Sequence, residues 1–275
     1  MVPVQQEHRR GLLLRVLPAG LYAGRASALL ERSALVSSRA WLVFASGVAE
    51  PLFYLLAFQI GFGKLVGEVA GPGGQVLSYV AFVAPALLAS SAMNGAVFDS
   101  TFNVFFKFRY AKLYDAMLAT PIGPLDIAIG EITWAVLRGG AYSLAFYGVM
   151  GGMGLIVTPW SLLLVPTALL LAFAFAAIGM ACATFLRTPS QFDFINLAVM
   201  PMFLFSTTFY PLEVYPEALR VVVQCTPLYH GVELMRGFFT GVLDPSMFGH
   251  VAYLVVMAGI GLWATSRRLG RLLLR

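Results

Sequence analysis

The sequence predicts an all-α membrane protein with six transmembrane helices, and its composition carries that prediction. Of the 275 residues, 59% are hydrophobic and only 11% are charged, whereas about 25% of a soluble domain is charged. The mean hydropathy is +0.82, and the apolar residues gather in stretches long enough to cross a bilayer as helices. This composition disfavours a soluble enzyme, a nucleic-acid-binding module and a disordered chain.

The first three predicted spans are defined by hydrophobic stretches with clear interruptions. The first covers residues 40–62 and contains Glu50-Pro51, which joins a kink-forming proline to an acid that is costly in lipid. The second covers residues 77–97 and follows the flexible Gly71-Pro72-Gly73-Gly74. The third covers residues 125–150 and ends in a cluster of glycines. Each stretch is long enough to cross the hydrocarbon core.

The last three predicted spans enclose an irregular segment. They cover residues 160–186, 192–209 and 247–265. Between the fifth and the sixth, residues 211–246 contain two apolar helical runs, each too short to span a bilayer and separated by Cys225-Thr226-Pro227. We expect a broken, re-entrant helical hairpin that dips in from the outer face, where protein covers its backbone. The alternative is a loop packed on the outer surface.

The basic residues predict the orientation of the spans. The net charge is +5, and in a membrane protein such an excess marks the cytoplasmic loops. The three loops assigned to the opposite side hold only Lys64, Arg220 and Arg236. Fourteen of the 18 basic residues fall on the other side: Arg9, Arg10, Arg15, Arg25, Arg32, Arg39, Lys107, Arg109, Lys112, Arg187, Arg267, Arg268, Arg271 and Arg275. Both termini are therefore expected in the cytoplasm.

The N-terminal segment, residues 1–39, precedes the predicted transmembrane domain of residues 40–266 and a basic cytoplasmic tail of residues 267–275. Its Arg25, Arg32 and Arg39 are spaced seven apart, so they share one helical face. This spacing predicts an amphipathic helix on the cytoplasmic membrane surface, with its arginines toward the headgroups. Simple charge anchoring of the N-terminus is an equally good interpretation.

The connection between the second and third spans has an amphipathic pattern that ends at Pro121. Apolar residues recur there at helical spacing between charged ones: Phe106, Tyr110, Leu113, Tyr114, Met117 and Leu118 alternate with Lys107, Arg109, Lys112 and Asp115. Such a short cytoplasmic helix can transmit movement from a soluble partner. The pattern is also typical of an ordinary interfacial helix, and periodicity alone favours that interpretation.

Charged and aromatic residues inside the spans are candidates for a translocation path or for pairing within the membrane. Glu131 and Arg138 lie seven apart on the third span, a separation of about 10 Å along a helix. Each is therefore expected to meet a group on another helix, or water in a cavity, and Glu50 is a possible partner for Arg138. Phe203 and Phe205 of the fifth span either face an amphipathic substrate or pack between helices.

The small polar inventory excludes several chemistries. None of the three lysines lies in a phosphate-cradling glycine loop, so the chain has no Walker A motif. The three histidines are scattered, and the two cysteines form neither a disulfide framework nor a metal-binding spacing. We therefore expect no metal, no cofactor and no enzyme activity in this chain. Uphill transport would need energy from another subunit or an ion gradient.

Five segments, taken in order, resemble one family. They are residues 50–55 with Gly61-Phe62-Gly63, residues 88–93, Tyr114-Asp115-Ala116-Met117-Leu118-Ala119-Thr120-Pro121, residues 130–135, and an outer segment from Phe209-Tyr210-Pro211-Leu212 through Thr226-Pro227-Leu228-Tyr229-His230 to Arg236-Gly237. The chain resembles the ABC-2 type permeases, most closely the lipo-oligosaccharide-export branch typified by the nodulation protein NodJ. The resemblance extends from the first span onward.

The resemblance implies an assembly. Two permease copies, as a homodimer, would surround a central path in the bacterial cytoplasmic (inner) membrane, docked to two separate cytoplasmic ABC ATPase subunits that bind ATP and Mg. Residues 106–121 would be the coupling helix, and residues 211–246 the outer re-entrant segment. The docking residues would be Phe106, Arg109, Lys112, Tyr114 and Asp115.

The leading interpretation is the permease subunit of an ATP-driven exporter that moves an amphipathic glycolipid or lipo-oligosaccharide outward. An antibiotic-efflux permease of the same family is the nearest alternative. Two other classes stay open: an energy-independent channel or scaffold, and a membrane enzyme acting on lipid-linked sugars. The enzyme would need an acid or base from the scattered Asp99, Asp115 and Asp126. No nucleic acid is expected as a partner.

Overall fold

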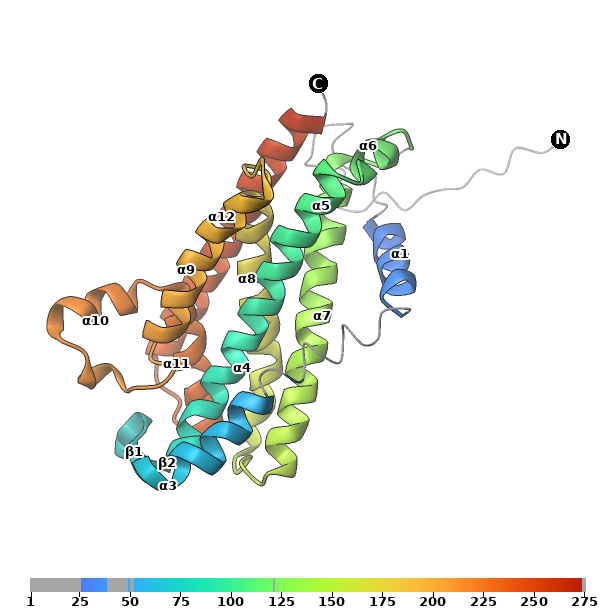
Figure 1. The fold of residues 1–275 in the computed structure, drawn as a ribbon. Coiled ribbons are helices and arrows are strands. Elements are labelled where there is room, and N and C mark those ends of the chain that lie inside the picture. The colour runs from blue at the N-terminus through green and yellow to red at the C-terminus, as the bar shows by residue number, and fades with distance from the viewer. Residues whose placement is uncertain (1–25, 39–48, 50–51, 121, 274–275) are drawn as a thin grey trace.

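The computed structural model describes residues 26–38, 49, 52–120 and 122–273. Its centre is a bundle of four long helices, shown in Figure 1: α4 (Tyr79–Phe98), α7 (Pro124–Gly152), α8 (Leu164–Ala183) and α12 (Ser246–Leu273). Helix α8 contacts the other three. Most of its buried positions are small residues, which let the neighbouring backbones approach closely.

The bundle helices begin at recognisable signals. The Ser78 hydroxyl accepts a hydrogen bond from the Ala81 amide at the start of α4, as an N-cap residue does. Helix α7 begins with a proline at its first turn, and the Asp126 carboxylate accepts a hydrogen bond of 2.9 Å from the Gly123 amide. Helix α8 continues from a 3-10 turn, η5 (Pro159–Leu163). These boundaries lie within a few residues of the predicted spans.

Three helices of the described part are long and apolar enough to cross a membrane: Tyr79–Arg109, Pro159–Ala183 and Ser246–Leu269. Helix α7 is not among them although it has 29 residues. Its charged residues Asp126, Glu131 and Arg138 lower its mean hydropathy. The first predicted span begins in residues outside the described part, and only the short apolar helix Leu52–Phe62 of it is described. The arrangement of six spans and the domain boundaries therefore stay predictions.

A small hairpin was not predicted by the sequence. After the π-helical η2 (Phe58–Phe62) and α3 (Gly63–Val66), strands β1 (Glu68–Ala70) and β2 (Val76–Ser78) pair antiparallel, with Val69 opposite Leu77. The 3-10 turn η3 (Pro72–Gly74) joins them, and both Gly73 and Gly74 have positive φ angles that glycine adopts without strain. The predicted flexible glycine run is thus an ordered turn, because its glycines close a strand pair.

The segment between the fifth and sixth predicted spans contains short helices. After η6 (Pro189–Gln191), α9 (Phe192–Phe205) ends earlier than predicted, and η7 (Leu212–Val214) is followed by α10 (Glu217–Gln224) and α11 (Pro227–Thr240). The break at Cys225-Thr226 lies where the sequence predicts it. Helix α11 packs on α4, α8 and α12, whereas α10 projects from the bundle (Figure 1). Entry of this pair into the membrane stays a prediction.

Helix α1 (Ala26–Ser38) packs against α7. Leu29 is buried there over Gly130, where an added Cβ would lie 2.8 Å from the Leu29 Cβ. Arg32 is exposed, but Arg25 and Arg39 lie outside the described residues, so the arginine stripe on the membrane surface stays a prediction.

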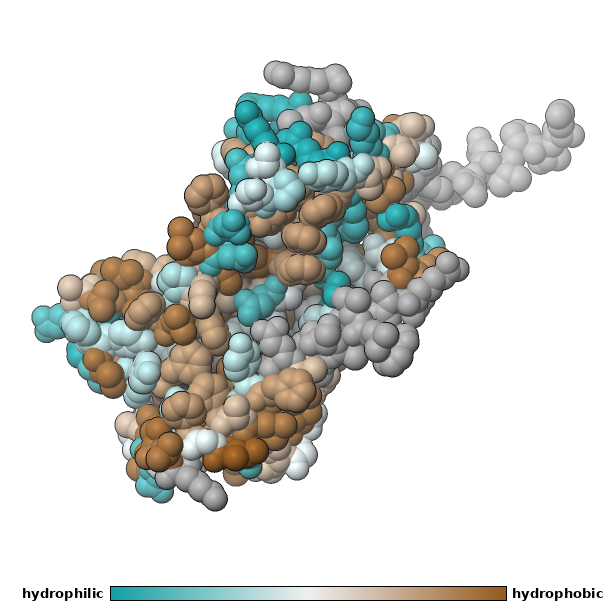
Figure 2. Space-filling model, viewed as in Figure 1, coloured by the Kyte–Doolittle hydropathy of each residue, from teal (hydrophilic) through white to brown (hydrophobic). Residues whose placement is uncertain are grey.

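The surface is polarised along the bundle. Figure 2 shows hydrophilic side chains gathered most densely at the end that carries α6 and the C-terminal end of α12, with hydrophobic surface over much of the rest. Basic residues from distant segments lie at this end, because Arg109 donates to the Leu186 carbonyl and Arg268 stacks on Phe185. Helix α12 also extends to Leu273, so most of the predicted tail continues the last helix.

Candidate functional site

The predicted coupling segment forms two short helices rather than one. Helix α4 runs through the π-helical η4 (Asp99–Asn103) into α5 (Val104–Arg109), and α6 (Leu113–Leu118) follows after a sharp corner. Lys112 makes the corner with a left-handed backbone, φ 44° and ψ 33°, which is uncommon for a residue other than glycine. The corner places α6 at the tip of the bundle (Figure 1). We call α5 and α6 together the docking segment.

A row of aromatic rings lies along the helix from the end of α4 to α5. Phe98 and Phe102 have ring centroids 5.1 Å apart, Phe102 and Phe106 are 4.6 Å apart, and Phe106 and Tyr110 are 5.1 Å apart. Such ring pairs contribute roughly 0.5–1.5 kcal/mol each beyond their burial. Phe106 is half-buried within this row, which connects α4 to α5 across the π turn.

The residues predicted to dock on a partner divide into exposed and buried ones. Arg109, Lys112 and Asp115 are exposed at the tip. Tyr114 is 0% exposed, and its ring packs 6.2 Å from that of Phe108. Tyr114 thus anchors α6 to the bundle from below, while the three charged residues face outward. Sequence periodicity could not distinguish these two faces of the helix, because both the bundle and a partner select apolar residues.

The Tyr114 hydroxyl lies in an unusual environment. It is fully buried. Burial raises the pKa of the Tyr114 hydroxyl well above its usual value, and the nearby Glu131 carboxylate raises it further. The tyrosine therefore stays neutral, and its hydroxyl is held close to a charge on α7.

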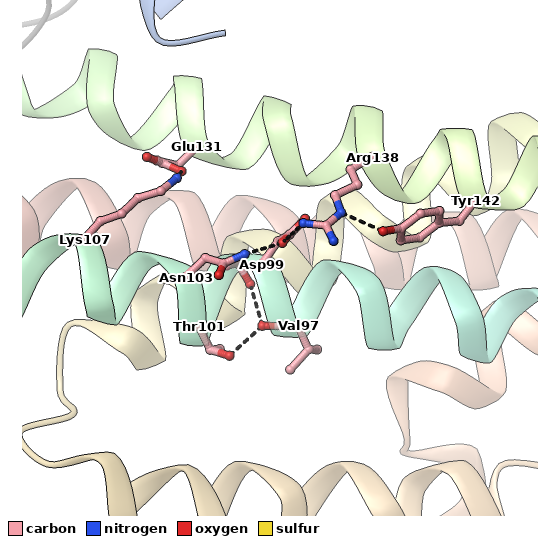
Figure 3. A network of polar contacts seen from close by, with 9 residues as sticks. Val97, Asp99, Thr101, Asn103, Lys107, Glu131, Arg138 and Tyr142 are labelled. Atoms are coloured by element: carbon pink, nitrogen blue, oxygen red, sulfur yellow. Dashed lines mark hydrogen bonds and ion pairs between the residues drawn. The ribbon is translucent and has the colours of Figure 1, made fainter. Parts of the chain in front are cut away.

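Two ion pairs join the α4–α5 helix to α7, as Figure 3 shows. The Lys107 Nζ lies 2.6 Å from the Glu131 Oε2, and the Arg138 Nη1 lies 2.8 Å from the Asp99 Oδ1. Arg138 also donates through Nε to the Tyr142 hydroxyl. Glu131 and Arg138 thus each meet a group on another helix, and Glu50, the partner suggested by sequence, lies outside the described residues.

The ion pairs are buried to different degrees. The side chains of Asp99 and Arg138 are 5% and 14% exposed, whereas those of Glu131 and Lys107 are 4% and 26% exposed. Asn103 donates a further hydrogen bond of 2.6 Å to the Asp99 Oδ1. A buried charge is costly unless it is paired and hydrogen-bonded, so each carboxylate depends on its cation. Sequence reasoning named Asp99 only as a scattered acid and missed its role as an ion-pair partner.

The candidate path residues on α9 lie on an exposed helix. Phe203 is half-buried against Phe209 and Tyr54, with ring centroids 5.2 Å and 6.5 Å away. Phe205 is exposed. Along α9 the side chains are exposed or half-buried, so this helix presents a largely uncovered apolar surface.

A second buried cation was missed by sequence reasoning. Arg236 of α11, assigned to an outer loop by the charge count, is buried, with its Nη1 2.8 Å from the Glu233 Oε1. Its Nη2 donates to the Thr207 carbonyl, and its guanidinium lies 3.9 Å from the Phe82 ring centroid. We call these four residues the Arg236 cluster. The helical Glu233-x-x-Arg236 spacing within the predicted hairpin was the available signal.

The fold and the buried charges define a helical membrane protein, and comparison with known proteins gives its family. The model of the ABC-2 type transporter family matches residues 25–240. The chain belongs to this family.

Relatives that cover most of the chain share one description, nodulation protein J. That of Rhizobium leguminosarum bv. trifolii is 30% identical over 231 residues, which is 83% of this chain and 86% of the relative. That of R. leguminosarum bv. viciae is 29% identical over 252 residues, 90% and 95% of the two chains. That of Bradyrhizobium diazoefficiens is 28% identical over 262 residues, 94% and 97% of the two chains.

Proposed function

We propose that this chain is the permease subunit of an ATP-driven ABC exporter that moves an amphipathic glycolipid or lipo-oligosaccharide outward. It works as a homodimer in a bacterial cytoplasmic membrane, with both termini in the cytoplasm and two separate ATPase subunits docked to it. The family match across residues 25–240 carries the proposal. The near full-length likeness to nodulation protein J supports the lipo-oligosaccharide class.

The docking segment supplies a surface suited to an ATPase. Arg109, Lys112 and Asp115 are exposed and charged, so they can pair with a soluble partner without the cost of removing a buried charge from water. Beneath them, Tyr114 ties α6 to the bundle. Because α5 continues α4, movement of a docked ATPase is delivered directly to a membrane helix.

The docking assignment is tested by co-purification. A Lys112→Glu/Asp115→Arg double variant reverses two exposed charges, one at the corner and one on α6, and should release an ATPase co-expressed with the permease. A matched Glu217→Arg control changes an exposed acid on α10 and should retain it. Thermal unfolding of each purified permease verifies that the fold is intact. Retention of the ATPase by a well-folded double variant would defeat the docking assignment.

The direction and the cargo are tested in inside-out vesicles. With ATP and the ATPase present, a fluorescent acylated oligosaccharide should accumulate in the lumen, and it should not do so when ATP is withheld. Daunorubicin serves as the competing cargo. Accumulation of daunorubicin alone would favour drug efflux, and flux without the ATPase would favour a channel.

A further inference from the structure

The two ion pairs cross between the same two helices with opposite polarity. Along the α4–α5 helix an acid, Asp99, precedes a base, Lys107, and along α7 an acid, Glu131, precedes a base, Arg138. The pairs Asp99–Arg138 and Lys107–Glu131 show that the helices run antiparallel. Each helix therefore presents one charge of each sign to its neighbour, at matching heights (Figure 3).

This charge pattern fixes the register of the two helices. The charges on each helix are separated by about 10–12 Å of helical rise. A slide of that size in one direction would bring Lys107 beside Arg138, and a slide in the other direction would bring Asp99 beside Glu131. Both arrangements oppose like charges in an apolar environment, which is costly. Setting register is the best-attested use of buried ionic groups.

The two pairs are not equivalent, because the π turn η4 lies between them. Asp99 begins η4, whereas Lys107 lies beyond it, on the docking segment. Within the turn, the Thr101 hydroxyl donates a hydrogen bond of 2.6 Å to the Val97 carbonyl. π turns are concentrated at functional sites and mark places where a helix changes its winding. The Asp99–Arg138 pair thus joins the end of α4 to α7, and the Lys107–Glu131 pair joins the helix beyond the turn to α7.

Glu131 is bound by α5, and α6 follows α5 directly after the corner at Lys112. The buried Tyr114 of α6 lies close enough to Glu131 for this carboxylate to raise the pKa of its hydroxyl, although burial is the larger cause. Lys107 of α5 contacts the same carboxylate at 2.6 Å. The Lys107–Glu131 contact therefore joins the docking segment to α7. We call Lys107, Tyr114 and Glu131 the junction.

We propose that Glu131, together with Lys107, is a positioning residue of the transport cycle, which holds the docking segment in register with α7. Movement of a docked ATPase then displaces α7 together with α4, instead of being absorbed as rewinding of the π turn. This inference rests on the proposed function and deepens it, because it names the contact through which the motor would drive a second membrane helix.

The first test uses the permease alone and does not depend on any ATPase. Lys107→Met and Glu131→Gln remove one charge each, and Lys107→Glu/Glu131→Lys restores a pair with reversed polarity. Glu217→Gln is the matched control on an exposed acid. Amide hydrogen exchange over residues 104–118 should accelerate about tenfold in both single variants, and the reversed pair should recover part of the protection. Equal exchange in wild type, control and single variants would overturn the inference.

The second test uses the assembled complex in vesicles. The single variants should retain the ATPase and hydrolyse ATP near the wild-type rate, while ATP-dependent transport of the fluorescent acylated oligosaccharide falls at least about fivefold. The reversed pair should regain much of the transport. A merely structural role would lower hydrolysis and transport in proportion to folded protein, and that result would overturn the positioning role. A wild-type complex without ATP-dependent transport would overturn the proposed function instead, and hydrogen exchange would still decide whether the junction holds the docking segment.

Discussion

Arg138, which is largely covered, and Arg236, which is buried, are held in different ways. Arg138 reaches from α7 to Asp99, which lies 39 residues away at the end of α4. Arg236 pairs with Glu233, three residues earlier on the same helix. The first ion pair joins α7 to the end of α4, whereas both members of the second belong to α11. The difference shows that the consequence of a buried charge depends on which element carries its partner.

The acids of the two pairs also differ in their access to water. Asp99 is 5% exposed, and one of its carboxylate oxygens has no hydrogen-bond partner in the described part of the chain. Glu233 is 26% exposed. If its arginine were removed, Asp99 would be left as an uncompensated buried charge, but Glu233 would be hydrated by a small side-chain movement. We therefore expect the two arginines to differ in their contribution to stability.

Replacement of Arg138 should have the largest effect. Arg138→Met leaves the buried Asp99 carboxylate without its cation. Removing one partner of a buried ion pair lowers the free energy of unfolding by about 3–5 kcal/mol. Thermal unfolding in detergent should show this loss. The double variant Asp99→Asn/Arg138→Met removes both charges and should recover much of it. A double variant no more stable than Arg138→Met would contradict the assignment of the loss to a stranded acid.

Replacement of Arg236 should have a smaller effect. Arg236→Met removes the hydrogen bond of 2.7 Å to the Thr207 carbonyl and the contact with the Phe82 ring. Because Glu233 becomes hydrated, we expect a loss of about 1.5–3 kcal/mol, the range for a hydrogen bond to a charged group. The same unfolding assay measures it. The comparison between the two arginines fails if Arg236→Met is the more damaging substitution.

Two glycines, one on α7 and one on α11, allow the packing of these two helices to be compared. At Gly130, an added Cβ meets the Leu29 Cβ at 2.8 Å, so α1 must shift, whereas at Gly231 it meets the flexible end of Leu171 at 2.7 Å. We expect Gly130→Ala to destabilise by about 1–2 kcal/mol and to increase hydrogen exchange over residues 26–38. Gly231→Ala should cost less. Gly148→Ala, which meets nothing within 4 Å, is the control, and equal losses at all three sites would refute this account.

The helices of the bundle could be predicted from sequence, because lipid-length apolar runs are read directly. The predicted second, third and fourth spans correspond to α4, α7 and α8 within a few residues. The hairpin of β1 and β2 could not be predicted, because its strands have three residues each, too few for an alternating pattern. Helix α9 was predicted too long, because the predicted span was continued through Ser206-Thr207-Thr208 to Phe209, whereas the backbone leaves the helix at Ser206.

Only some residues of the candidate site could be predicted from the sequence. The charges of the third span were recognisable because charge is costly in lipid, so Glu131 and Arg138 could be named. Their partners could not, because Lys107 is 24 residues and Asp99 is 39 residues away, and pairing depends on how two helices pack. The burial of Tyr114 has the same cause, since helical periodicity does not tell which side of α6 the bundle covers.

The smallest expected effect on stability comes from a contact between two histidines. One of them, His230, lies on α11, the helix that carries Arg236. The Nδ1 atoms of His230 and His250 lie 2.7 Å apart, so one ring N–H must donate a hydrogen bond to the unprotonated nitrogen of the other ring. Tyr253 stacks on His230 with ring centroids 3.9 Å apart. Burial, followed by the neighbouring His250, lowers the pKa of His230 to about 4. The pair therefore exists only while at least one imidazole is neutral.

The sign of the pH dependence follows from this lowered pKa. An unfolded histidine has a pKa of about 6.5, so between that value and about 4 the unfolded chain binds more protons at His230 than the folded chain. Stability contributed here is present above about pH 6.5 and is lost as the pH falls toward 4. The unfolding temperature should therefore drop over this range in wild type, and His230→Gln should flatten the drop. Gly148→Ala, which changes no titratable group and meets nothing within 4 Å, should keep it. An unchanged pH profile in His230→Gln would show that the histidine contact does not control the acid response.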